Sequence, residues 1–207
     1  MLFFSGSAPS LPITNTLFIF VSSSTDWFAP GWKQEWIIRA IEFYSKFPKN
    51  RYLLLTKNPG ALEKLIKEGT ITLPDTFLIG TTLETNRECS KLYRSTVMPS
   101  PTERAEALAR IKHPHKMVCC DPLVQFDATR FASMIKEIRP DLVYIGFNTS
   151  NCVLPEPTRE EVQELIERLA AFTNVELFNS FKCSGFWKTG KRRKNTISDP
   201  LLIPCLS

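Results

Sequence analysis

The sequence predicts an α/β protein, an incomplete (β/α) TIM-like barrel with about six parallel strands. Short apolar runs alternate along the chain with segments of helical periodicity, and each run ends in a polar cluster. Buried parallel strands joined by right-handed crossover helices have this pattern. Six strands fit an incomplete barrel or an open sheet better than a closed barrel, which usually has eight. The predicted strands are at residues 17–21, 52–55, 77–80, 117–120, 142–145 and 175–178.

Start and stop signals predict the helices. The first follows residues 30–31 and ends at Pro48, and its apolar positions, listed below, are expected to form a single core-facing stripe. The second begins with Asn58 as N-cap and a proline at the first turn. Residues 85–100 are expected to form a short helix and a loop. The stripe of the first helix consists of Trp32, Trp36, Ile37, Ala40, Ile41, Tyr44 and Phe47.

Three further helices have recognisable N-termini. Residues 100–103 and 158–161 are capping boxes, with Ser or Thr three residues before Glu. Asp127 is expected to cap the helix between them. The apolar positions of these segments recur at helical spacing and predict buried faces.

Length and composition are typical of one globular domain: 207 residues, 43% hydrophobic and 23% charged. We expect an irregular lead-in at residues 1–15, the partial barrel at 16–180 and a basic tail at 181–207. The net charge of +5 is concentrated at residues 188–194, which permits a nucleic-acid partner.

The predicted location is cytoplasmic, with no membrane partner. The first apolar run has five residues and no preceding positive charge, unlike a signal peptide or a membrane span. The six cysteines contain no CxxC pair and are expected to be reduced thiols.

Polar residues at the strand ends are the candidate site, because ligands bind at the carboxyl ends of parallel strands. Asp26 either binds a ligand or satisfies backbone donors in its turn, and Lys57 either enters the site or points to solvent. Glu84 directly follows a strand. Asp121 precedes a proline and either accepts bonds from a ligand or bonds locally. Asn148 follows the fifth strand.

No metal site is expected. His113 and His115 precede adjacent cysteines, Cys119 and Cys120, but adjacent side chains on a strand point to opposite faces. Nor do the cysteines have the compact spacing of an iron–sulfur site. P-loop, GxGxxG, GxSxG and HExxH motifs are absent from the sequence.

An ordered set of segments resembles the radical S-adenosylmethionine proteins allied to spore photoproduct lyase, particularly a phage-associated and archaeal group. The likeness spans roughly residues 15 to 170, and it depends on the order and spacing of the segments. The segments are 18–28 (FIFVSSSTDWF), 52–59 (YLLLTKNP), 79–86 (IGTTLETN), 119–123 (CCDPL), 144–146 (YIG) and 154–157 (LPEP).

The resemblance implies a partial barrel that binds S-adenosylmethionine at its carboxyl face, with a DNA-repair-like radical lyase ancestry. Glu84 and Asp121 would lie near the cofactor or substrate, although the group usually has Glu where Asp121 stands. Thr56, Lys57 and Asn148 would line the same mouth, and Asp26 belongs to the first matched segment.

One departure limits this inference. Proteins of that superfamily hold a [4Fe–4S] cluster with a CxxxCxxC loop on an earlier strand, and no such motif occurs here. We therefore expect the cluster only if a companion polypeptide or a missing segment supplies it.

Three functions remain open, and whether the chain is itself an enzyme is left undecided. The chain is expected to be the cluster-less portion of a split or truncated radical enzyme that acts on nucleic acid. Alternatively it is a non-catalytic nucleic-acid-binding or accessory module. The third is a metal-free lyase or hydrolase that uses Glu84 and Asp121 as acid and base.

Overall fold

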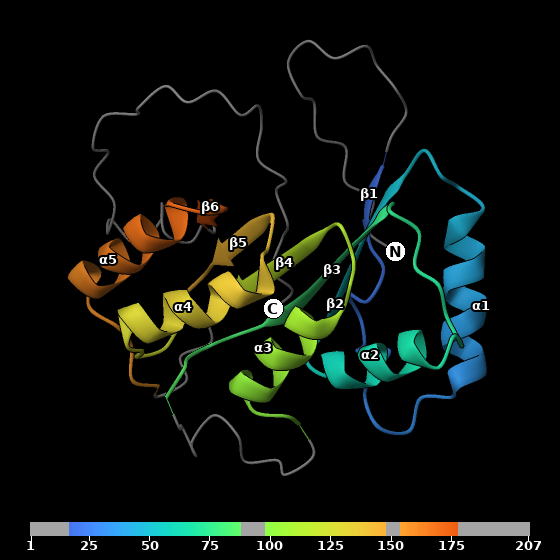
Figure 1. Cartoon of the computed structure of the whole chain (residues 1–207), viewed down its shortest axis with the longest axis horizontal. Coiled ribbons are helices and arrows are strands. Elements are labelled where there is room, and N and C mark those ends of the chain that lie inside the picture. Colours follow the sequence, from blue (N-terminus) through green and yellow to red (C-terminus); the bar gives the residue numbers. More distant parts are fainter. Residues whose placement is uncertain (1–16, 88–97, 148–153, 178–207) are drawn as a thin grey trace.

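A computed structural model describes residues 17–87, 98–147 and 154–177. Within these ranges six parallel strands form one sheet in the order β1-β2-β3-β4-β5-β6. The sheet curls into a half-barrel with the helices along its outer side (Figure 1). The predicted incomplete barrel is confirmed. The strands are β1 (Phe18–Phe20), β2 (Arg51–Thr56), β3 (Phe77–Thr82), β4 (Lys116–Cys120), β5 (Leu142–Ile145) and β6 (Asn174–Leu177).

The helices begin where the capping signals predict. The Asn58 and Asp127 side chains accept hydrogen bonds from the first turns of their helices, and Ser100 and Thr158 form reciprocal capping boxes. None of the described helices is long and apolar enough to cross a membrane. The helices are α1 (Gln34–Ser45), α2 (Pro59–Lys67), α3 (Pro101–Arg110), α4 (Ala128–Ile138) and α5 (Arg159–Ala170).

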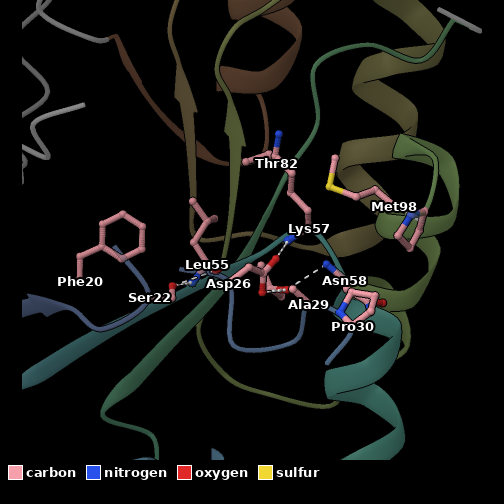
Figure 2. Close-up of a pocket in the computed structure, with 12 residues that line it drawn as sticks. Phe20, Ser22, Asp26, Ala29, Pro30, Leu55, Lys57, Asn58, Thr82 and Met98 are labelled. Atoms are coloured by element: carbon pink, nitrogen blue, oxygen red, sulfur yellow. Dashed lines mark hydrogen bonds between the residues drawn. The ribbon is translucent and has the colours of Figure 1, made fainter. Parts of the chain in front are cut away.

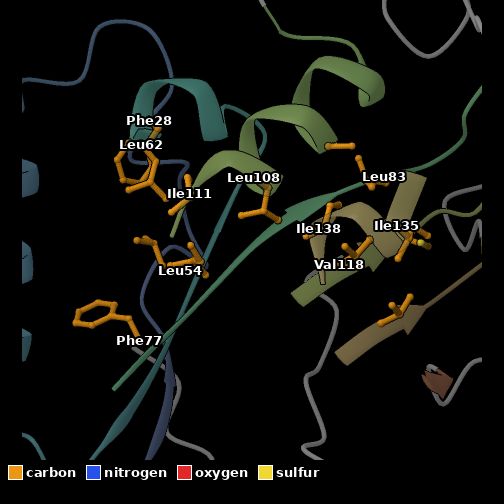
Figure 3. Packing of buried hydrophobic residues seen from close by; sticks show 14 of the residues in the cluster. Phe28, Leu54, Leu62, Phe77, Leu83, Leu108, Ile111, Val118, Ile135 and Ile138 are labelled. Carbon is orange, nitrogen blue, oxygen red and sulfur yellow. The ribbon is translucent and has the colours of Figure 1, made fainter. Parts of the chain in front are cut away.

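The main core lies between the sheet and the helices (Figure 3). Leu54, Ile79 and Val118 point from the strands toward it, and Leu62 and Leu108 meet them from the helices. Burial of such side chains is the dominant favourable term in folding. The regular alternation of strands and helices in the sequence predicts this core between the sheet and the helices.

The opposite, concave face of the sheet is also apolar, and among the described residues its side chains come only from the strands. In this concave cluster, register aligns side chains of neighbouring strands, as at Leu53 and Leu78 or Cys119 and Tyr144. Both faces of every central strand are therefore apolar, which explains the continuous hydrophobic runs. The concave cluster consists of Leu53, Met117, Leu142 and Tyr144, with Phe18, Phe20, Leu55, Leu78 and Cys119 packed against them.

The prediction for the first helix is partly wrong. Ile37 and Ile41 are buried as expected, but Trp36 and Phe47 are each 47% exposed. The predicted stripe is wider than one face, and α1 lies beside the edge strand β1, where there is less structure to cover it (Figure 1). The predicted lead-in, the tail and most of the 85–100 excursion lie outside the described residues.

Candidate functional site

A cavity of about 240 Å³ opens at the carboxyl ends of β1, β2 and β3. Asp26 comes from the loop after β1, Lys57 directly follows β2, and Thr82 is the last residue of β3. Phe20 and Leu55 form an apolar side of the cavity, and Pro30 and Asn58 lie on the opposite side (Figure 2). Polar residues from three separate segments thus meet at one rim, as parallel strands require.

The Asp26 carboxylate holds the β1 and β2 ends together. Its Oδ1 accepts hydrogen bonds from the Thr56 hydroxyl at 2.7 Å and the Phe28 amide at 3.0 Å, and its Oδ2 accepts one from the Lys57 amide at 2.7 Å. Thr56 in turn accepts a bond from the Asn58 amide at 2.9 Å. The structure thus shows the local role that was one of the two alternatives for Asp26. Thr56, which was expected to line the mouth, does so and also bonds locally, and Asp26 lines the cavity as well.

Ser22 extends the pairing of β1 with β2 past the last residue of β1. Its hydroxyl donates to the Leu55 carbonyl at 2.8 Å and accepts from the Leu55 amide at 3.0 Å. A side chain thus replaces the backbone of the next strand residue. This positions the loop that carries Asp26.

Glu84 lies between two cations. Arg104 Nη2 on α3 donates to its Oε2 at 2.6 Å and Lys57 Nζ is 3.3 Å from its Oε1. A second bond from Arg104 Nη1 reaches the Thr82 hydroxyl at 2.7 Å. Glu84 and Arg104 are buried, whereas Lys57 is 41% exposed. The Lys57 side chain is thus the part of this group that is exposed and belongs to a residue lining the cavity.

The two cations determine the charge state of Glu84. Burial raises the pKa of this carboxyl, but the charge and hydrogen bonds of Arg104, with the charge of Lys57, outweigh burial and lower the pKa to about 2. Glu84 is therefore ionised throughout the physiological range. A carboxylate that stays ionised and is paired with two cations is poorly suited to act as a general acid.

Asp121 lies at the end of β4, beside the end of β5, and it is not among the residues that line the cavity. The backbone around it is tied to the next strand, because the Gly146 amide donates to the Cys120 carbonyl at 2.9 Å and the Leu123 amide donates to the Gly146 carbonyl at 2.8 Å. The half-buried Asp121 side chain lies directly over Gly146.

The cavity therefore gathers part of the predicted site. It is lined by Asp26, Thr56 and Lys57, and Glu84 joins it through Lys57. Asp121 belongs to the same rim but to another strand pair. Asn148 lies outside the described residues.

A family comparison adds to this geometry. The model of a family described as a protein of unknown function, DUF5131, matches residues 9–194. The chain belongs to this family. Searches among curated proteins and among solved structures give no match.

The described residues of this DUF5131 chain do not form a metal or cluster site. Cys119 faces the concave cluster, whereas Cys120 is fully buried toward the helices, and burial raises its pKa well above the ordinary thiol value. The His113 ring bonds to the Phe77 carbonyl and precedes β4, so it is at the other end of the strand from the cysteines. The donors that are close in sequence are thus separated in space. The other four cysteines lie outside the described residues.

Sequence reasoning missed Arg104, Thr82, Phe20 and Met98 as parts of the site. For Arg104 a signal was available, since it is four residues before the buried Leu108 on α3 and so falls on the apolar face of the helix. A charged residue on such a face requires a buried partner. The other three have no local signal, because apolar residues and threonine are common in strands.

Proposed function

We propose that the mouth of the half-barrel binds S-adenosylmethionine, and that this chain is the cofactor-binding portion of a radical S-adenosylmethionine-like protein that acts on nucleic acid. The cofactor is named by the resemblance of the strand-end segments. The observation that supports it is the cavity at the ends of β1, β2 and β3, which joins the partly exposed Lys57 side chain to apolar walls.

The chemistry of the cavity matches the ligand in two respects. Lys57 Nζ offers a cation for the carboxylate of the methionine part. Phe20, Leu55 and Met98 offer apolar surface for the aliphatic chain or the adenine ring. These residues would hold the ligand and keep water from one side of it.

The size of the cavity restricts how the ligand would lie. Its volume of about 240 Å³ is below the roughly 300–1,000 Å³ of pockets that enclose a small molecule. It can therefore take one moiety, and the remainder of the ligand would extend toward the concave cluster, of which Phe20 and Leu55 are already part.

The Glu84–Arg104 pair would position Lys57 rather than touch the ligand. A ligand carboxylate that approaches Lys57 competes with Glu84 for the ammonium. Arg104 remains bonded to Glu84 at 2.6 Å, so Glu84 does not become an uncompensated buried charge when Lys57 turns away. Lys57 is then free to reorient at low cost.

The S-adenosylmethionine of a radical enzyme supplies a radical when an iron–sulfur cluster reduces it. The described residues do not fit such a cluster, and we assign no redox step to them. Their part is to bind and orient, and a companion polypeptide or a further segment would carry the CxxxCxxC loop.

Isothermal titration calorimetry of the full chain with S-adenosylmethionine tests the proposal. Saturable binding is expected, and Lys57→Met should weaken it by about tenfold, as expected for loss of one charge-assisted contact. Lys57→Arg should retain most of the affinity. Methionine and adenosine, titrated separately, identify which moiety the cavity takes.

Controls separate the site from the remaining surface. Lys64→Met removes an exposed ammonium from α2 and should leave the affinity unchanged. Asp121→Ala and Glu84→Ala test the residues that the resemblance places near the ligand, with thermal melts to check the fold. The absence of binding at millimolar ligand, or equal affinity of the wild type and Lys57→Met, would refute the proposal.

The alternative function, a nucleic-acid-binding module, is favoured by a separate observation on α1.

A further inference from the structure

Helix α1 and the turn that follows it present three large aromatic side chains to solvent. Trp36, Phe43 and Phe47 are 47%, 51% and 47% exposed. Trp36 and Phe43 are seven residues apart on one side of α1, and Phe47, two residues beyond the last residue of the helix, continues the row through its ring contact with Phe43. We call these three side chains the α1 aromatic stripe. Most other large apolar side chains of the described residues are at least half-buried.

The stripe is not the core-facing side of the helix. Ile37 and Ile41 are buried against the sheet, and Tyr44 stacks on Trp27 with ring centroids 6.1 Å apart. The rings of Phe43 and Phe47 instead contact each other edge to face on the surface, at 5.4 Å. Packing of α1 on the sheet thus leaves the stripe outside.

Basic side chains flank the stripe. Lys33 Nζ is 5.3 Å from the centroid of the Trp36 ring, and Arg39 and Lys46 each stand three or four residues from a stripe member. Residues 33–51 contain five Lys or Arg and two Asp or Glu, and all seven of these charged side chains are exposed.

This local excess stands out against the charge balance of the chain. Residues 188–194 hold five of the 26 basic residues and no acidic one, so the remaining 21 basic residues equal the 21 acidic ones. Within that neutral remainder, residues 33–51 are a positive segment. The charge complements a polyanion.

We propose that the α1 aromatic stripe and its basic flank bind single-stranded nucleic acid. Unpaired bases stack on exposed aromatic rings, and Lys and Arg beside the rings contact the phosphates. At a rise of about 1.5 Å per residue, Trp36 and Phe43 are about 10 Å apart along α1, and Phe47 continues the row beyond the end of the helix. A duplex would not expose its bases to these rings.

The surface also connects to the cavity. Pro30 lines the cavity, and α1 begins four residues later at Gln34, so the Trp36 end of the stripe is near the barrel mouth. A strand bound along α1 would have one end close to that mouth.

Self-association explains the surface less well. Three half-exposed aromatic side chains offer much less than the roughly 800 Å² per partner of a stable interface. The excess of positive charge would also face its own copy across a two-fold axis.

Fluorescence anisotropy with a labelled 12-nucleotide oligothymidine tests the proposal on the full chain. Trp36→Ala, Phe43→Ala and Phe47→Ala should each weaken binding by about fivefold or more, the effect of losing one stacked base. Replacement of Lys33, Arg39 and Lys46 by Gln should lower the slope of log affinity against log salt by about 2. Binding should quench tryptophan emission, and Trp36→Phe should remove most of that quenching.

Two control variants define the outcome. Lys64→Gln on α2 removes a cation without an aromatic neighbour and should leave affinity nearly unchanged. A variant with residues 188–194 neutralised should keep its dependence on the aromatic stripe. The proposal is overturned if the aromatic variants bind like wild type, if only the tail variant loses binding, or if duplex binds as tightly as single strand. Sedimentation that shows a dimer dissociated by the three alanine substitutions, without oligonucleotide binding, also overturns it.

Discussion

The carboxyl group of Asp121 occupies the space beside Gly146 that a side chain would need. A Cβ built on Gly146 would lie 2.6 Å from Asp121 Cγ and 2.7 and 2.9 Å from its two oxygens. The residue that follows β5 must therefore be glycine for the Asp121 side chain to stay where it is. The contact connects the rim of β4 to that of β5.

Gly146→Ala should destabilise the protein by about 1–3 kcal/mol, because the methyl group overlaps the Asp121 carboxyl group and one of the two must move. Urea denaturation measures the change in the free energy of unfolding. Gly60→Ala is the matched control, since the nearest atom to its new Cβ is 3.8 Å away and alanine favours helix α2.

A second substitution tests the cause. Asp121→Ala combined with Gly146→Ala should recover most of the loss, which would appear as a favourable coupling energy in the double-mutant cycle. If the two costs simply add, the Asp121 contact is not the reason for the glycine.

The Glu84–Arg104 pair should give the protein a specific acid sensitivity. The folded pKa of about 2 is below the ordinary value of 4.5, so the ionised carboxylate stabilises the fold above pH 4.5. That stabilisation, on the order of 3 kcal/mol, is lost as the pH falls from 4.5 toward 2. Wild type should therefore lose more stability over this range than Glu84→Gln, as measured by urea midpoints at each pH.

The opposite result for the wild type and Glu84→Gln would contradict this prediction. Parallel loss of stability in wild type and Glu84→Gln between pH 5 and 2 would mean that Glu84 is not held ionised by Arg104. Glu106→Gln is a suitable control, because that carboxylate is exposed on α3.

Removal of Arg104 alone should lower the stability of the protein more than removal of the Arg104 and Glu84 charges together. Arg104→Met leaves Glu84 buried with Lys57 as a cation and should cost about 3–5 kcal/mol. The double variant with Glu84→Gln should be more stable than Arg104→Met alone. Thermal unfolding of the wild type and these two variants measures this, and a double variant that is less stable than Arg104→Met would contradict it.

Lys116 is a buried cation that donates to backbone carbonyls rather than to a carboxylate. Its Nζ donates to the carbonyls of Leu108 and Ala109 at 3.0 and 3.3 Å, near the end of α3. Lys116→Met keeps the length of the side chain but leaves these carbonyls without that donor, and should cost about 1–2 kcal/mol. Lys112→Met, an exposed neighbour, should change the urea midpoint little. Equal urea midpoints for the two variants would show that the hydrogen bonds of Lys116 contribute nothing to stability.

Much of the architecture was predictable because each element has a local cause. The capping boxes at residues 100–103 and 158–161 start helices in the structure as they do in the sequence. The apolar runs became strands of one parallel sheet, since runs of that length separated by helices have few other packings. The error at Trp36 and Phe47 arose where the barrel ends, because periodicity identifies an apolar face but not whether a neighbouring element covers it.

The site was predictable only in part. The order of the strands brought Asp26, Thr56 and Lys57 to one cavity, because parallel strands deliver their carboxyl ends to the same rim. The roles of these residues were harder to predict from the sequence. Whether Asp26 bonds its own loop or a ligand depends on where the Thr56 hydroxyl lies, and local sequence does not encode that position.

The sequence by itself determined the alternation of strands and helices, the caps and the rim at which polar residues collect, since each depends on spacing along the chain. Only the tertiary structure decided that Arg104 keeps the Glu84 carboxylate ionised, that Gly146 makes room for Asp121 and that the α1 aromatic stripe faces solvent. These depend on distances between segments 20 or more residues apart, which are set by how the sheet curls and where it stops.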